Sequence, residues 1–499
     1  MRNEKLLKTA LGLLPKLIYK DVSPINMTEI QYLSKGDSII IDFGDHQVGR
    51  LAFDLKSVGS HADAPAFLKI HFAEREIELY ENPAEYKGWI SASWIEEEQI
   101  HVDVIPSRVS LERRYSFRYV KIEVLDISDK FKLYLDNVVC TSESSADDSK
   151  LVPLNSDNQF HKDLDRVAIK TLHDCMQLVF EDGPKRDRRL WIGDLRMQAL
   201  ANYETYRNND LVKECLYLFG ALTNDEERVG ACIFLEPEPE VDDTFMFDYS
   251  LFFINTLLDY YKQTGDVQAV NDLWHVCKRQ IELAKENLDE NYVVRDSDKL
   301  GWCFVDWNLM LNKQASAQGI FLYALEAAIE LAQIAGDVMA EEEYAQDYLK
   351  LKSAANSFLF DEEKKLYVSG ADRQISYASQ VWMILGGAVE GNGAVKLIER
   401  LRQEESALTM VTPYMFHNFV EALIMIGEKN QALKEMEEYW GGMLKEGADT
   451  FWELYNPKNP NESPYGGTIV NSYCHAWSCG PTYFLRKYFC NERGYICQR

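Results

Sequence analysis

The segment from Asp182 to Asp194, DGPKRDRRLWIGD, has residue types and spacing that could carry chemistry. It holds three aspartates, three arginines, a lysine and a tryptophan in thirteen residues. Pro184 prevents a continuous helix from running through it, so most of the segment is expected to form a loop. A loop so rich in charge is difficult to bury as ordinary core. It is typical of a polar pocket with an aromatic wall, as a sugar site needs.

Asp187 is the central residue of this loop, and the sequence leaves two interpretations open. With Arg186 and the two arginines that follow, it could form a salt-bridge network that braces the loop. Alternatively, burial and neighbouring charges tune its pKa for proton transfer. Asp182, Arg186, Trp191 and Asp194 are candidates for binding substrate in the same pocket. Asp194 also lies at the expected start of the next helix, where a negative charge is favourable, so its role could be structural instead.

A second candidate carboxylate, Glu453, lies far along the chain between two aromatic residues. Trp452 precedes it, Tyr455 follows it, and Pro457 ends the aromatic run. Glu453 is either an exposed loop residue or a catalytic carboxylate beside aromatic rings.

Four further candidates lie between these segments and one lies after them. Trp302, Asp306 and Trp307 combine two indoles with a carboxylate that could accept hydrogen bonds from adjacent hydroxyls, although an aromatic core loop would look similar. Asp248 is either a helix cap or a hydroxyl ligand. His475 lies between Tyr473 and Trp477, and we expect it to donate to a hydroxyl or to support a residue that does, although a lone histidine near a helix start is more often structural.

The sequence has no Ser/His/Asp set, glycine-rich phosphate loop or dinucleotide fingerprint. Ten cysteines are scattered without a CxxC pair or zinc spacing, and the acidic run 236–243 lacks the spacing of a calcium loop and is expected to be solvated. We therefore expect no cofactor and no metal. Two carboxylates from distant parts of the chain favour glycoside hydrolysis.

The elements that must position these residues fall into two parts. After an N-terminal extension (1–35), short β-rich runs at 38–42, 49–55, 67–72, 99–105, 118–124 and 131–135 predict a β-sandwich domain over 36–141. The polar stretch 142–154 is interpreted as a linker.

From residue 155 to 490 the apolar period changes to 3.6, and 491–499 form a C-terminal tail. Twelve helices are predicted, at 157–179, 193–206, 209–221, 247–263, 266–288, 314–336, 340–358, 376–388, 393–404, 415–427, 430–443 and 472–488. Sequential hairpins with long loops at alternate connections favour an (α/α)6 toroid, an all-α catalytic domain. An irregular α-solenoid is the alternative. The long loops are 180–192, 224–246, 289–313, 405–414 and 444–471, and a toroid would gather them at one end.

Bulk properties narrow the function classes. A chain of 499 residues is expected to form two or more domains. A net charge of −27 disfavours nucleic acid and anionic membranes as partners, and no apolar stretch is long enough to span a bilayer. The apolar run near the N-terminus is short and contains Pro15, so we expect no signal peptide and a cytoplasmic protein. The oligomeric state is left open.

In their order along the chain, these motifs resemble those of bacterial α-L-rhamnosidases of glycoside hydrolase family 78. The family signature runs Asp, any residue, Pro, Gln, Arg, an acid, Arg, two residues, Trp, Thr, Gly, Asp. The resemblance is carried by Asp182–Asp194, Thr450–Glu453 (TFWE), Phe304–Trp307 (FVDW), Asn471–Trp477 (NSYCHAW), and Ile41–Gly44 with Gly49. It runs from about residue 36 to the end of the chain.

The resemblance implies an inverting hydrolase that releases terminal α-L-rhamnose from an oligosaccharide or glycoside. Asp187 falls at the general acid position and Glu453 at the general base position. The positions that the family uses for sugar hydroxyls or for the aromatic pocket are Asp182, Trp191, Asp194, Asp306, Trp307, Trp452 and His475. The sequence departs from the family where Asp187 replaces the usual Glu and Lys185 the usual Gln, and it lacks extra β-domains. A hydrolase of another sugar and a non-catalytic carbohydrate-binding relative are the alternatives.

Overall fold

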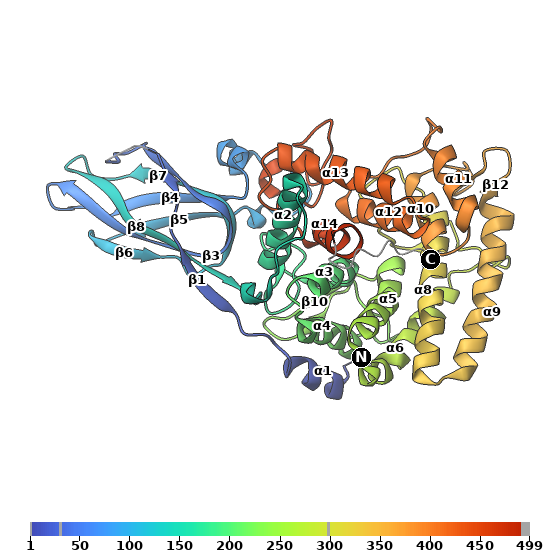
Figure 1. Cartoon of the computed structure of the whole chain (residues 1–499). Coiled ribbons are helices and arrows are strands. Elements are labelled where there is room, and N and C mark those ends of the chain that lie inside the picture. The colour runs from blue at the N-terminus through green and yellow to red at the C-terminus, as the bar shows by residue number, and fades with distance from the viewer. Residues whose placement is uncertain (1, 29–31, 297–299, 491–499) are drawn as a thin grey trace.

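The protein consists of an N-terminal sheet and a larger helical part (Figure 1). The computed structural model describes residues 2–28, 32–296 and 300–490. In Figure 1 the sheet lies on the left and the helices on the right. None of the described helices is both long and apolar enough to span a membrane. The prediction of an N-terminal β domain followed by a helical domain is confirmed at this level.

The sheet contains eight strands, all paired antiparallel. They are β1 (Ile18–Val22), β2 (Asn26–Met27), β3 (Ser38–Gly59), β4 (Ala66–Ala73), β5 (Glu97–Val102), β6 (Ser107–Ser110), β7 (Tyr115–Asp126) and β8 (Phe131–Ser144). The order is β1-β8-β3-β7-β4-β5, and β2 and β6 also pair with β3. The long strand β3 bonds to β7 over its first half and to β8 over its second, with a register shift between Asp42 and Gln47.

This long strand changes the expected picture of the domain. The runs predicted as separate strands, 38–42 and 49–55, are both parts of β3. Because β3 bonds to partners in both halves, the described strands form one continuous sheet and not two separate ones. Alternate side chains such as Phe53, Phe72 and Phe117 point to one side and bury a shared apolar cluster.

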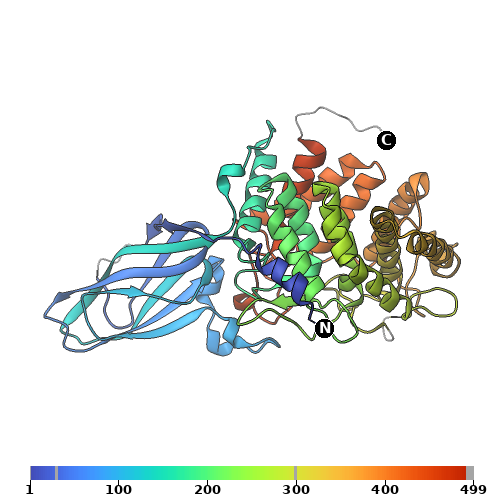
Figure 2. The ribbon, with the colours of Figure 1, turned by 90° about the horizontal axis from the view of Figure 1, so that it is seen from below.

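The expected extension and linker both contribute regular structure. Within 1–35, helix α1 (Glu4–Leu11) packs against α4 (Asn209–Ala221) of the helical part, and β1 and β2 join the sheet. Figure 2 shows α1 lying along the helices. Within 142–154, β8 continues to Ser144, whose hydroxyl donates to the His173 carbonyl at 2.6 Å.

The helical part alternates between deeply buried helices and helices with one exposed face. Mostly buried are α3 (Ile192–Glu204), α5 (Phe247–Thr264), α8 (Gln314–Ala335), α10 (Tyr377–Leu385), α12 (Pro413–Met425) and α14 (Gly480–Phe484). Between them lie α2 (Gln159–Cys175), α4 (Asn209–Ala221), α6 (Val267–Lys285), α9 (Val338–Ala354), α11 (Gly391–Leu401) and α13 (Lys429–Lys445). The buried helices contact one another in chain order from α3 to α12, and α14 contacts α3.

The helix predicted at 472–488 is the main error in the helical part. The α-helix α14 begins only at Gly480, with Pro481 in its first turn, and continues as a π-turn from Leu485. The preceding segment, 472–476, bonds through its backbone to two loops instead. Glu453 N donates to Ser472 O at 3.0 Å, and Ala476 N donates to Asp182 O at 2.7 Å. Backbone groups used in this way are not available for a helix.

Candidate active site

A cavity of about 490 Å³ opens where the long loops of the helical part meet the sheet domain. Such a volume is in the range of small-molecule sites. It brings together residues from loops that are far apart in the sequence. Among the predicted site residues, those lining it are Asp182, Arg186, Asp187, Trp191, Asp194, Trp302, Asp306, Trp307, Glu453 and His475.

Asp182 organises the loop that begins with it. One carboxylate oxygen accepts from Asp187 N and the other from Arg189 N, each at 3.1 Å. Burial, together with the charge of Asp187, raises the pKa of Asp182 to about 8. The loop therefore folds back on its first residue, and this turn directs Asp187 to the cavity wall.

Asp187 is half-buried and lies among charges of both signs. Burial raises its pKa above the ordinary value; Arg186 and Arg189 oppose this, while Glu453 and Asp242 reinforce it. The direction of the shift suits a carboxyl group that keeps its proton until it donates it.

Two basic residues of the loop anchor it to the sheet domain. Lys185 forms a fully buried ion pair with Glu78, and Arg188 Nη2 lies 2.6 Å from Glu96 Oε1. Both carboxylates belong to the segment between β4 and β5. The sequence leaves a salt-bridge network and proton transfer as alternative roles for the charges of this loop. Lys185 and Arg188 form ion pairs that brace the loop against the sheet domain. Asp187 takes part in neither pair.

Glu453 also lines the cavity and is held by two donors. Arg186 Nη2 lies 2.5 Å from Glu453 Oε2, and the Tyr465 hydroxyl donates to Oε1. The Arg186 guanidinium also lies 3.8 Å from the centre of the Tyr465 ring and donates to Val470 O at 2.7 Å. Arg186 and Tyr465 thus fix the position of both oxygens of the Glu453 carboxyl group.

Four buried polar atoms around the cavity have no hydrogen-bond partner among the described residues. They are Trp191 Nε1, Asp194 Oδ1, Trp307 Nε1 and His475 Nδ1. His475 Nδ1 and Asp194 Oδ1 are 3.5 Å apart, and burial lowers the pKa of His475 and raises that of Asp194. Unsatisfied buried donors and acceptors are costly, so a ligand carrying hydroxyl groups would complete them.

Asp306 lines the cavity but is strongly bonded to the protein. Its carboxylate accepts from Val411 N at 2.8 Å, Thr412 N at 3.0 Å, Thr412 Oγ1 at 2.7 Å and Trp307 N at 3.0 Å. Burial raises its pKa to about 6. Asp306 therefore ties the loop 405–414 to the cavity in addition to lining it.

Two predicted binding residues lie outside the cavity lining. Asp248 is fully buried and accepts from Phe304 N and Val305 N at 2.9 Å, so it shapes the next loop and does not face the ligand space. Trp452 is 1% exposed and lies under the Arg75 guanidinium, 4.3 Å from its ring centre. Its neighbour Glu453 lines the cavity, whereas Trp452 belongs to the buried apolar core.

The sequence did not identify the contribution of the sheet domain to the cavity. Trp89 and Ile90, from the segment between β4 and β5, line it. Trp89 Nε1 donates to Pro464 O at 2.8 Å, and the Tyr86 hydroxyl donates to Tyr465 O at 2.8 Å. Nothing in the local pattern around Trp89 distinguishes it from a surface residue. The cavity lining also includes four aromatic residues that the sequence does not single out as binding residues: Tyr249, Phe304, Tyr465 and Trp477.

Comparison with known proteins agrees with this arrangement. The model of the glycosyl hydrolase family 78 alpha-rhamnosidase N-terminal domain matches residues 14–142, and that of the bacterial alpha-L-rhamnosidase 6 hairpin glycosidase domain matches residues 150–489. A search of curated proteins returned no match.

Solved structures extend the likeness to the whole chain. A rhamnosidase from Klebsiella oxytoca with rhamnose bound is 42% identical, covers 98% of this chain and 99% of its own, and has a TM-score of 0.95. A family 78 rhamnosidase of Bacillus sp. GL1 shares the fold at 22% identity and a TM-score of 0.75, over 97% of this chain and 48% of its own. The two family models and the Klebsiella likeness together show that the chain belongs to glycoside hydrolase family 78 and is a glycosidase.

Proposed function

We propose that this protein is an inverting α-L-rhamnosidase that releases terminal α-L-rhamnose from an oligosaccharide or glycoside. The observation that carries the proposal is the single cavity that Asp187, Glu453 and the unpartnered polar atoms share. The 42% identical Klebsiella oxytoca rhamnosidase, which has rhamnose bound, supports the choice of sugar.

In the proposed reaction Asp187 is the general acid and Glu453 the general base. Asp187 gives its proton to the glycosidic oxygen as the bond to the anomeric carbon breaks. Glu453 takes a proton from a water that attacks the same carbon from the opposite face, so the configuration inverts. We expect the two carboxyl groups to be roughly 6.5–9.5 Å apart, which leaves room for that water.

We assign the sugar to the buried end of the cavity. Asp182, Asp194 and His475 offer acceptors and a donor to its hydroxyl groups, and the Trp191 and Trp307 N–H groups can donate to them. Apolar ring surface in the same lining suits the methyl group that rhamnose carries at C5.

We assign the leaving group to the side of Asp187 that faces a second cavity. Asp187 also lines this cavity of about 520 Å³, together with Trp94, Arg189 and Phe234. The Arg189 guanidinium lies 4.2 Å from the centre of the Phe234 ring. A general acid must reach the oxygen that joins the sugar to its leaving group, and a carboxyl group between two spaces meets that need.

The helical part is proposed to be a closed (α/α)6 toroid. The contacts from α3 through α5, α8, α10 and α12, with the turn Ala476–Ser478 touching both α12 and α3, support a closed ring. An open solenoid would leave the first and last buried helices apart.

The test is a panel of aryl glycosides that differ only in the sugar. Release of the aryl alcohol from α-L-rhamnoside, and little from the other sugars, is expected. Preferred release from another sugar would overturn the proposed specificity. Binding of L-rhamnose without release from any member of the panel would make the protein a carbohydrate-binding relative.

A further inference from the structure

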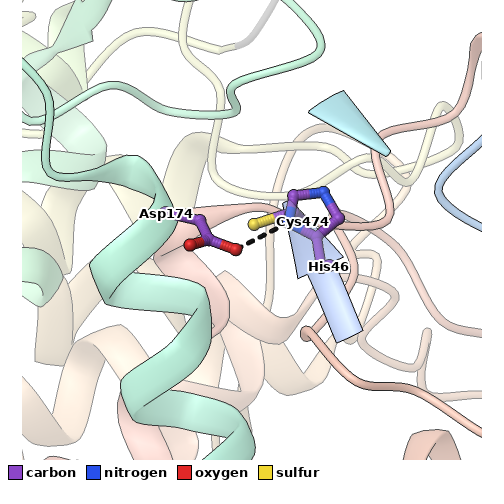
Figure 3. Close-up of side chains that lie close together, drawn as sticks. All are labelled: His46, Asp174 and Cys474. Carbon is purple, nitrogen blue, oxygen red and sulfur yellow. Dashed lines mark hydrogen bonds and ion pairs between the residues drawn. The ribbon is translucent and has the colours of Figure 1, made fainter. Parts of the chain in front are cut away.

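A buried polar cluster joins the sheet domain to the helical part, and one of its residues precedes His475 of the active-site cavity in the chain. Its members in Figure 3 are His46 from β3, Asp174 near the end of α2, and Cys474 from the segment 472–476. All three are buried, and His46 Nδ1 lies 2.6 Å from Asp174 Oδ2.

The other ring nitrogen of His46 faces the sheet domain. Its Nε2 lies 2.9 Å from Ser116 Oγ and 3.2 Å from Glu74 Oε1, and Ser116 Oγ donates to Glu74 Oε1 at 2.8 Å. With acceptors at both nitrogens, the ring carries two protons and donates in both directions. Burial alone would lower the pKa of His46, but Cys474 and the two carboxylates raise it well above 6.5.

A histidine, a carboxylate and a thiol could together ligate a metal ion, but positive charge already occupies this position. Lys170 Nζ lies 2.7 Å from both oxygens of Asp174, and His173 Nδ1 lies 2.7 Å from one of them. The cluster is therefore a hydrogen-bonded charge network whose carboxylate is already neutralised.

Glu74 connects this network to the active site. Its second oxygen accepts from Tyr473 N at 2.5 Å. On either side of Tyr473, Ser472 O accepts from Glu453 N at 3.0 Å, and Ala476 N donates to Asp182 O at 2.7 Å. His475, which lies between Tyr473 and Ala476 in the chain, lines the cavity. One short backbone segment thus holds the loops of the proposed acid and base.

We propose that His46 is a positioning residue for catalysis: through Ser116 and Glu74 it sets the segment 472–476, and with it the relative placement of Glu453 and Asp182. The sheet domain then acts on turnover as well as on folding. The kinetic part of this inference rests on the proposed rhamnosidase function, whereas the structural part does not.

Two substitutions separate the two sides of the His46 ring. His46→Gln keeps an N–H donor near the position of Nε2, toward Ser116 and Glu74. His46→Asn keeps an N–H donor near the position of Nδ1, toward Asp174. Leu55→Ala is the matched control, because Leu55 is fully buried in the sheet core and belongs to β3 as well. We expect all three variants to lower Tm.

The measurements are kcat and KM on an aryl α-L-rhamnoside, and hydrogen exchange of peptides covering 472–476. His46→Asn should lower kcat on the order of 10- to 100-fold with KM nearly constant, because small misplacements of reacting groups cost that much. It should also accelerate exchange in 472–476. His46→Gln should retain most of kcat, and Leu55→Ala should change neither readout.

Unchanged exchange in 472–476 for His46→Asn would overturn the inference even if the enzyme proves inactive on rhamnosides. Equal kcat values for His46→Asn and Leu55→Ala in an active enzyme would also overturn it. A fall in wild-type Tm on chelation, reversed by Zn²⁺, would instead identify the cluster as a metal site. Failure of the proposed function would appear separately, as wild-type inactivity on the aryl rhamnoside.

Discussion

Replacing Arg186 with an uncharged residue should impair Glu453, the proposed base, while the Glu453 side chain itself is retained. The Arg186 side chain is 5% exposed, and its guanidinium lies 2.5 Å from Glu453 Oε2 and 2.7 Å from Val470 O. Arg186→Met would break this buried ion pair, which costs about 3–5 kcal/mol when one partner is left behind. About 1–2 kcal/mol of that belongs to the Val470 carbonyl that loses its donor.

The remainder, about 2–3 kcal/mol, falls on Glu453, whose carboxylate loses the guanidinium that holds it in place. Since 1.36 kcal/mol corresponds to a factor of ten, kcat/KM should fall by roughly 30- to 150-fold. Tyr465 still donates to Glu453, so some activity should remain. The assay is kcat/KM for an aryl α-L-rhamnoside under conditions in which both proteins stay folded.

Arg188→Met is the matched control for this loss of activity. Arg188 lies in the same loop and forms a comparable ion pair, but its partner is Glu96 of the sheet domain. It should lower Tm and leave kcat/KM nearly unchanged. An unchanged kcat/KM in Arg186→Met, or an equal fall in both variants, would refute the assignment of Glu453 as the base.

Two further predictions follow from the positions of the tryptophans and from the buried acids. Trp452→Phe should lower the free energy of unfolding by about 1–3 kcal/mol and leave KM unchanged, because Trp452 is buried outside the cavity. Trp191→Phe should raise KM several-fold, because Trp191 lines the cavity. A raised KM with an unchanged Tm in Trp452→Phe would show that Trp452 belongs to the binding site. Because the pKa of Asp182 is about 8, against an ordinary value of 3.8, the folded protein holds a proton that the unfolded chain releases. Holding this proton stabilises the folded state at low pH, and the stabilisation is lost as the pH rises toward 8. The Tm of the wild type should therefore fall more steeply between about pH 5 and about pH 8 than the Tm of Asp182→Asn. Equal slopes of Tm against pH in the two proteins would contradict this prediction.

Much of the helical part could be predicted because apolar period and capping signals agree there. The helix expected at 247–263 is found at Phe247–Thr264 and ends at Gly265, whose φ of +69° is the left-handed conformation that glycine adopts readily. The error at 472–488 arose because the backbone of 472–476 bonds to the loops that carry Glu453 and Asp182, and an apolar pattern does not reveal such bonds. Pro481 did mark the true helix start, since proline is favoured in the first turn.

The candidate site was predictable where carboxylates and aromatics concentrate in one loop, as in 182–194. It was not predictable where tertiary packing decides which way a side chain points. Trp452 and Glu453 are adjacent, and only the fold determines which of them faces the cavity. Trp89 comes from a different domain, so no local pattern could bring it to the cavity.

The central claim is that Asp187 and Glu453 act as a general acid and a general base on an α-L-rhamnoside. Its most direct test follows the anomeric proton by time-resolved NMR as the wild type and Glu453→Gln act on that substrate. The wild type should release β-L-rhamnose first, before mutarotation, and the variant should release almost none. First appearance of the α anomer, or undiminished release by Glu453→Gln, would contradict the claim.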